Sequence, residues 1–259
     1  MKTINLTRHT VLACAVTLLM GCGSSGTADT AALTTTAVTT AAITAAASVA
    51  DTVTASATVA DDVTGSVADT TTTATTTSTA TTLTADETAT LLFVREEEKL
   101  ARDVYLTLFN KWGTKTFQNI ALNSEQQHMD VMGTLVDTYN LQDPVLTDTI
   151  GAFTDPVLLG LYQDLVMRGS TSQNDGLLVG GFIEEFDIND LQEAIDEANA
   201  GSKPADIIVA YTNLMCGSRN HLRSFVGQIE KNGVDYQAQV IPQATVDAIV
   251  NSPEEQCGK

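Results

Sequence analysis

Apolar residues recur at helical spacing along the second part of the chain, from residue 86 to the C-terminal end. The first apolar stripe, in residues 85–113, consists of Phe93, Leu100, Ala101, Val104 and Leu108. The second stripe, in residues 115–141, consists of Phe117, Ile120, Ala121, Met132, Leu135 and Tyr139. Pro144 follows the second stripe and blocks its continuation as a helix. The spacing therefore predicts two long helices.

The rest of this part has the same periodicity. A shorter helix is expected in residues 154–170, where Asp155 and Pro156 form a helix start and Gly169 a stop. Long helices are expected in residues 172–201 and 203–233, and one short helix in residues 236–259. No segment has the alternation of a strand. The pattern predicts an all-α domain over residues 86–259, with four long helices and one or two short ones.

Two features modify the expected helix in residues 172–201. Gly180 and Gly181 weaken its helix propensity and allow another part of the chain to approach closely. Asp187 has the residue type of an N-cap, so the segment is expected to break there.

The first part of the chain has a different composition. Residues 1–22 combine Lys2 and Arg8 with an apolar run that ends in "LLMGC", which resembles a bacterial lipobox. This resemblance implies cleavage before Cys22, lipidation of its thiol, and anchoring at a membrane of the cell envelope. The alternative is an ordinary signal peptide followed by an incidental cysteine.

Residues 23–85 are rich in Thr and Ala and contain neither an aromatic residue nor a Lys or Arg. Such a composition cannot bury enough apolar surface to offset the entropy lost on ordering, so we expect a disordered tether. The formal net charge of −19 argues against nucleic acid as a partner and is compatible with cations. Cys216 and Cys257 are the cysteines of the helical part, and an oxidising compartment would permit a disulfide between them.

Polar residues interrupt the apolar stripes at a few positions. Glu97 lies in the middle of the first stripe, with Glu96 and Glu98 turned to either side and free to be solvated. The other residues expected to face the interior are Glu125, His128, Glu184 and His221, with Glu185 as an alternative to Glu184. Buried charges are costly unless they are compensated.

This set is typical of a carboxylate-bridged metal site. The ferritin-like pattern takes one Glu from each of two helices and a Glu-x-x-His pair from each of two others. Glu125 and His128 match one such pair, but the position three residues before His221 is Ser218. A hydroxyl is a poor iron ligand, so one carboxylate is missing. Asp187 and Glu185 are candidates to replace it; one metal ion, or none, are the alternatives.

The segments "REEEKLARDVYLTLFNKWG", "FQNIALNSEQQHMDVM", "FIEEFDINDLQEAID" and "GSRNHLRSF" resemble the ferritin-like family catalogued as domain of unknown function 2202. The resemblance covers roughly residues 88 to 230. It implies a ferritin-like four-helix bundle with a dinuclear metal centre, and it supplies no reaction.

Two functions remain open at this point. The first is a membrane-tethered metal protein that binds iron, with manganese or zinc as alternatives, and carries out iron oxidation or oxygen or peroxide chemistry. Tyr105 is then a candidate redox side chain or a plain core residue. The second is a metal-free helical module for adhesion at the cell surface, in which Arg219 or Arg223 pairs with the inward carboxylates.

Overall fold

The computed structural model describes residues 82–258, and within this range it contains helices and no β-strand. The helical elements are α2 (Ala85–Trp112), α3 (Lys115–Ile120), η1 (Ala121–Glu125), α4 (Gln126–Thr138), α5 (Pro156–Gly169), α6 (Gln173–Ala200), α7 (Ala205–Lys231) and α8 (Gln243–Val250). The all-α prediction is confirmed for this range. The expected signal segment, Cys22 and the expected tether lie outside it, except for the last residues before α2.

The helix ends follow from local sequence. The Thr84 side chain accepts the backbone N–H of Glu87, and the Glu87 side chain accepts that of Thr84, which together form a capping box at the start of α2. Gly113, with a φ of 68°, ends the same helix in a left-handed conformation that favours glycine. The predicted start of α5 is confirmed, since Asp155 caps the helix and Pro156 is its first residue.

The break expected near Asp187 is wrong. Helix α6 runs without interruption from Gln173 to Ala200, and Ser172 caps its start. Asp187 is buried in the middle of the helix, where its carboxylate accepts a hydrogen bond from the Ser218 hydroxyl of α7. A tertiary partner therefore engages the side chain that local propensity assigned to a cap.

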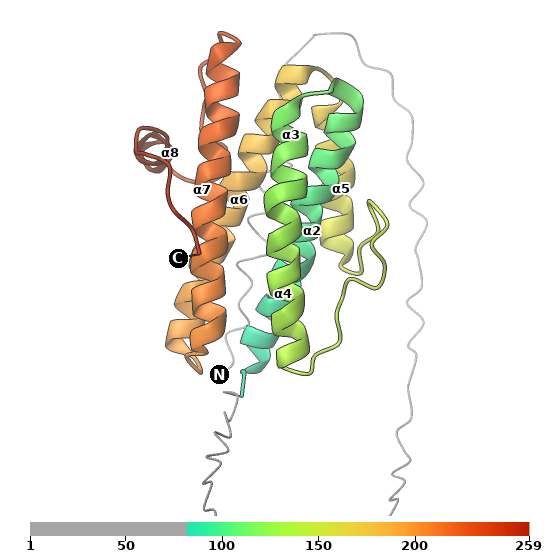
Figure 1. Ribbon diagram of the computed structural model, residues 1–259, viewed down its shortest axis with the longest axis vertical. Helices are drawn as coiled ribbons and strands as arrows, with labels where there is room; N and C mark the ends of the chain where they lie inside the picture. The colour runs from blue at the N-terminus through green and yellow to red at the C-terminus, as the bar shows by residue number, and fades with distance from the viewer. Residues whose placement is uncertain (1–81, 259) are drawn as a thin grey trace, which may run out of the picture. The chain divides into compact units, whose positions relative to one another are not determined.

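The long helices pack side by side along their lengths (Figure 1). Helix α6 pairs with α7, while α2 packs against the α3–η1–α4 segment, α5 and α6. Helix α4 also contacts α7, and the short α8 packs on α7. Helix α2 is thus covered on several sides. None of the helices in residues 82–258 has both the length and the apolar composition required to cross a membrane.

The close approach expected at the Gly180–Gly181 pair is confirmed. A Cβ atom added to Gly180 would lie 2.4 Å from Cε1 of Phe225, and one added to Gly181 would lie 2.4 Å from the hydroxyl oxygen of Tyr236. Both distances are far below van der Waals contact. The two glycines therefore allow α7 and the segment after it to pack against α6.

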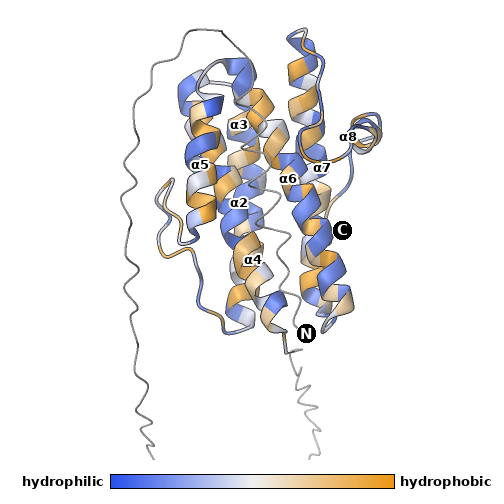
Figure 2. Cartoon of the chain, turned by 180° about the vertical axis from the view of Figure 1, so that it is seen from behind, coloured by the Kyte–Doolittle hydropathy of each residue, from blue (hydrophilic) through white to orange (hydrophobic). Residues whose placement is uncertain are grey.

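The interior contains two apolar clusters. The Phe225 cluster includes Leu100, Val104, Tyr105, Leu108, Phe117, Ile120, Ala121, Leu177, Phe182, Leu222 and Phe225. The Met132 cluster includes Leu91, Val94, Met132, Leu135, Val136, Leu191, Ala194, Tyr211 and Leu214. Figure 2 shows hydrophobic and hydrophilic residues alternating along the helices. The segments α2, α3–η1–α4, α6 and α7 each contribute to both clusters, and polar residues lie where they pass from one to the other.

Candidate metal centre

Four carboxylates and two imidazoles occupy the zone between the Phe225 cluster and the Met132 cluster. They belong to Glu98, Glu125, Glu184, Asp187, His128 and His221, and none is more than 9% exposed. Burying this many ionisable groups costs free energy unless they compensate one another or bind a cation. The apolar clusters on both sides exclude most of the solvent that would otherwise solvate them.

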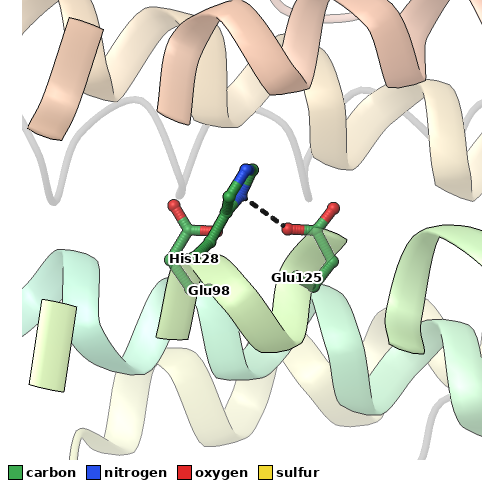
Figure 3. Close-up of side chains that lie close together, drawn as sticks. All are labelled: Glu98, Glu125 and His128. Atoms are coloured by element: carbon green, nitrogen blue, oxygen red, sulfur yellow. Dashed lines mark hydrogen bonds and ion pairs between the residues drawn. The ribbon is translucent and has the colours of Figure 1, made fainter. Parts of the chain in front are cut away.

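The first group consists of Glu98, Glu125 and His128, whose candidate ligand atoms all lie within 4.8 Å of one another. Nδ1 of His128 is 3.0 Å from Oε2 of Glu98 and 3.0 Å from Oε2 of Glu125. Figure 3 shows the imidazole ring between the two carboxylates, with Glu98 contributed by α2 and Glu125 by the neighbouring helical segment. One imidazole nitrogen thus faces two carboxylates from different elements.

The second group consists of Glu125, Glu184 and His221, with ligand atoms again within 4.8 Å of one another. Nδ1 of His221 is 2.9 Å from Oε1 of Glu125 and 3.3 Å from Oε2 of Glu184. Glu125 therefore belongs to both groups, and it directs one carboxylate oxygen toward each histidine. A shared carboxylate is the feature that allows two adjacent metal ions to be bridged.

Glu125 is the last residue of a π-helical turn, Ala121–Glu125, which separates α3 from α4. Single π turns inside helices are frequent at functional sites, because they redirect side chains without ending the helix. The turn also places Ser124, whose Oγ lies 2.8 Å from Nε2 of His221. The apolar periodicity predicted one uninterrupted helix here and contains no signal for this turn.

On α2 the structure places Glu98, rather than the expected Glu97, in the first group. Glu97 is also buried but belongs to neither group. The expectation that the flanking residues are solvated is wrong, since Glu96 is 2% and Glu98 1% exposed. Glu96 accepts backbone N–H groups of Thr154 and Asp155. Because α2 is packed on several sides, all three adjacent carboxylates have protein neighbours.

The sequence left Glu184 and Glu185 of α6 as alternatives for the residue of the site, and the structure distinguishes them. Glu184 joins the second group. Glu185 is fully buried and points to the C-terminal segment, where it accepts hydrogen bonds from the backbone of Gln239, Val240 and Ile241 and from the Tyr236 hydroxyl. Glu185 therefore holds the segment after α7 against α6 and does not contribute to either group.

The two arginines that were candidates to pair with the inward carboxylates lie elsewhere. Arg219 and Arg223 both bind Glu255, with Nη2–Oε distances of 2.5 and 2.8 Å. In the described part of the chain, the ion pairs of Glu98, Glu125 and Glu184 are formed with the two histidines alone. No arginine takes the place of a metal ion in these pairs.

The electrostatics of the site favour protonated imidazoles. Burial would lower the pKa of His128, but the charges of Glu98 and Glu125 raise it well above its ordinary value. The pKa of His221 rises to about 10, because the charges of Glu184 and Glu125 outweigh burial. Each imidazole then holds a proton between carboxylate oxygens, and a metal ion that binds Nδ1 has to displace that proton.

The carboxylates respond to burial in different ways. Burial raises the pKa of Glu98, Glu184 and Asp187, and neighbouring carboxylate charges add to this. Burial would also raise the pKa of Glu125, but the charges of His221 and His128 lower it below its ordinary value. Glu125, which faces both imidazoles, is therefore the most strongly ionised member of the site.

Two carboxyl oxygens of this zone bear on whether a metal ion fits there. Oε1 of Glu98 and Oδ1 of Asp187 are buried and form no hydrogen bond within residues 82–258. Buried polar atoms without a partner are uncommon, and a bound ion or water is a common explanation for them. A donor set of carboxylates and imidazoles suits iron, manganese or zinc. The residues present therefore fit a divalent transition metal.

Tyr105 lies directly beside the second group. Its hydroxyl donates a hydrogen bond of 2.5 Å to Oε1 of Glu184. Its ring is fully buried and packs against Phe225 and Phe117, with centroid distances of 5.2 and 6.0 Å. It is thus both a core residue and a hydrogen-bond donor to a candidate ligand.

A pocket of about 450 Å³, lined mainly by α4, α7 and the C-terminal segment, reaches both imidazoles. Its lining includes Ser124, Gly217, Glu255 and Cys257 besides His128 and His221. Cys257 forms a disulfide with Cys216, with a Cα–Cα distance of 5.7 Å, which settles the pairing that the sequence left open. The C-terminal segment is therefore fastened to α7 beside the site and forms part of the pocket wall.

Known proteins resemble this chain in sequence and in structure. The family model described as the uncharacterised protein domain DUF2202 matches residues 87–253. The uncharacterised protein MJ0754 of Methanocaldococcus jannaschii is 46% identical over 170 residues, which are 66% of this chain and 89% of that protein. The crystal structure of the hypothetical protein MJ0754 from Methanococcus jannaschii DSM 2661 is similar with a TM-score of 0.64 and 45% identity, covering 67% of this chain and 96% of that chain.

Proposed function

Because the chain belongs to the DUF2202 family, whose description gives no activity, we propose its function from the site: a ferritin-like protein with a carboxylate-bridged dinuclear metal centre. The observation that carries this proposal is the position of Glu125. It directs Oε1 to the histidine of one group and Oε2 to the histidine of the other. Each group adds one further glutamate, so two metal positions share one bridging ligand.

The arrangement of the helices supports a ferritin-like bundle. Four long helical segments, α2, α3–η1–α4, α6 and α7, each contribute a residue to the site. A lone Glu comes from α2 and another from α6, and a Glu-x-x-His pair comes from the segment ending in α4. This is the distribution of ligands in ferritin-like carboxylate proteins, apart from the serine at position 218 of α7.

The proposed metal is iron, with manganese or zinc as alternatives. When bound, two irons would supply ferrous oxidation or the reduction of oxygen or peroxide. Glu98 and Glu184 would each hold one position, and His128 and His221 would ligate through Nδ1. Tyr105 would orient Glu184 through its hydroxyl, and the flanking apolar clusters would exclude bulk water.

We further propose that the domain is held at the cell envelope through a lipidated Cys22. This residue and the tether lie outside the described residues, and the proposal is supported by the "LLMGC" segment of the sequence. The disulfide between Cys216 and Cys257 is consistent with an oxidising compartment. The proposed partners are metal ions and the membrane that carries the anchor.

Metal content and stability test the function. The purified chain is expected to bind two divalent transition-metal ions, and a chelator should then lower its melting temperature, because metal stabilises the folded state. Glu125→Gln should weaken both positions. Glu185→Gln, which removes a buried carboxylate outside both groups, should leave the stoichiometry unchanged. A chain that binds no metal and does not respond to the chelator would instead be the metal-free helical module.

A further inference from the structure

Asp187 and Ser218 occupy matching positions on two paired helices. On α6, Asp187 follows Glu184 by three residues, and on α7, Ser218 precedes His221 by three residues. Side chains three residues apart emerge on the same face of a helix. Asp187 and Ser218 therefore lie about one turn away from the second group on the face that carries it, and their side chains bond to each other.

The direction of these three-residue steps, from Glu184 to Asp187 and from His221 to Ser218, indicates the position of Asp187 along the bundle axis. On both helices the step leads toward the Met132 cluster. Leu191 of α6 and Leu214 of α7 belong to that cluster. The step from Glu125 to His128 on the neighbouring segment runs toward the same cluster. Asp187 is thus placed near the level of the first group, although its carboxyl is not among the ligand atoms that lie within 4.8 Å of one another there.

The buried Asp187 carboxyl has few partners in the described part of the chain. It is 5% exposed, and its Oδ2 is engaged by the Ser218 hydroxyl. Its Oδ1 is buried and has no hydrogen-bond partner in residues 82–258, and no salt bridge to Asp187 is formed there. Burial, and then the neighbouring carboxyls of Glu98, Glu184 and Glu125, raise the pKa of Asp187 above its ordinary value. A buried carboxyl in such surroundings is neutralised either by a proton or by a cation, and a metal ion would supply the cation.

We propose that Asp187 is a further ligand of the first metal position, that Ser218 orients it, and that it replaces the glutamate expected at position 218. The inference rests on the proposed function and adds a ligand to it. The Ser218 hydroxyl bonds to Oδ2, which leaves Oδ1 without a hydrogen-bond partner in residues 82–258 and available to a metal ion. The missing carboxylate of α7 is then supplied by α6, and the first position is held by Glu98, Glu125, His128 and Asp187.

The test is a titration of the full chain with Zn²⁺ alone, for the wild type and for Asp187→Asn. Asparagine keeps the shape of the side chain and can still accept the Ser218 hydrogen bond, so the substitution removes the charge and little else. We expect one of the two equivalents to bind at least about 10-fold more weakly, because a ligand of one position is lost. The other equivalent, at Glu184 and His221, should retain its affinity, which also shows that the variant is folded.

Glu185→Gln is the matched control, because it removes an adjacent buried carboxylate that bonds to the C-terminal segment. It should leave both affinities unchanged. Asp187→Asn with two equivalents of wild-type affinity would overturn the role of Asp187 and leave the dinuclear site standing. A wild-type chain that binds no Zn²⁺ and no Fe²⁺ would overturn the proposed function and this inference together.

Discussion

At the scale of single residues, the absence of a side chain at Gly217 sets the position of a candidate ligand. A Cβ atom at this position would lie 2.7 Å from Nε2 and 2.8 Å from Cε1 of His128. The His128 imidazole occupies the space that the side chain of any residue other than glycine would need at position 217. The ring of His128 is therefore held between α7 on one side and the carboxylates of Glu98 and Glu125 on the other.

Gly217→Ala should displace the His128 ring and weaken metal binding at the first position. Gly227→Ala is the control in the same helix, because a Cβ there meets nothing within 4 Å. It should leave metal binding unchanged and stabilise α7 by about 0.5–1 kcal/mol, since alanine is a better helix former than glycine. Metal titration and thermal unfolding of both variants measure these effects. Equal metal binding by both would show that the contact with His128 has no role in the site.

The sequence was sufficient to identify most of the residues that meet at the site. Glu125, His128, Glu184 and His221 were all expected to face the interior, and the structure brings them together. Glu98 was missed because it follows Glu97 by one residue and therefore points about 100° away from the apolar stripe. Such a stripe identifies the inward face of a helix only when the helix has a single buried side. Helix α2 has several.

At the scale of elements, the C-terminal segment is fastened to α7 by polar contacts next to the pocket. Glu255 accepts hydrogen bonds from Arg219 and Arg223, and Asn220 donates to the Glu255 carbonyl. The disulfide between Cys257 and Cys216 lies beside them. These contacts hold one wall of the pocket that reaches both imidazoles.

The contribution of Glu255 to stability should depend on pH. The hydrogen bonds from Arg219, and then those from Arg223, lower the pKa of Glu255 from its ordinary 4.5 to about 2. A folded-state pKa below the unfolded one adds stability that is fully present above the unfolded value and is lost as the pH falls toward 2. The unfolding free energies of wild type and Glu255→Gln should therefore differ near neutral pH and converge at about pH 2. A difference that does not change across this range would contradict the assigned pairing.

The elements themselves were largely predictable, and the exceptions have physical causes. The start of α5 at Asp155 and Pro156 follows from rules that act within a few residues. The π turn that ends at Glu125 and the unbroken course of α6 through Asp187 depend on contacts with other helices. Local sequence does not contain that information.

At the scale of the whole molecule, the sequence joins an N-terminal segment that resembles a bacterial lipobox signal to a helical domain. If Cys22 carries the lipid, Cys22→Ser should move the protein from the membrane fraction to the soluble fraction or block its processing. Fractionation of the cells that produce it, followed by mass spectrometry of the N-terminus, measures both. Unchanged membrane association and processing would contradict the lipobox.

The bundle as a whole places a zone of ionisable residues between two apolar clusters. Buried charges have to be compensated, and the two histidines here face four carboxyls, of which Glu98, Glu184 and Asp187 have raised pKa values. Divalent cations would supply the remaining positive charge. The proposed metal binding thus follows from the same clustering of buried ionisable groups.

Anomalous X-ray scattering from crystals of the chain loaded with Fe²⁺ under anaerobic conditions tests the dinuclear centre most directly. We predict two anomalous peaks, one about 2.0–2.2 Å from Nδ1 of His128 and the other at the same distance from Nδ1 of His221. Both should contact Glu125. No peak between the carboxylates, with both imidazoles still bonded to Glu125, would contradict the proposed metal centre.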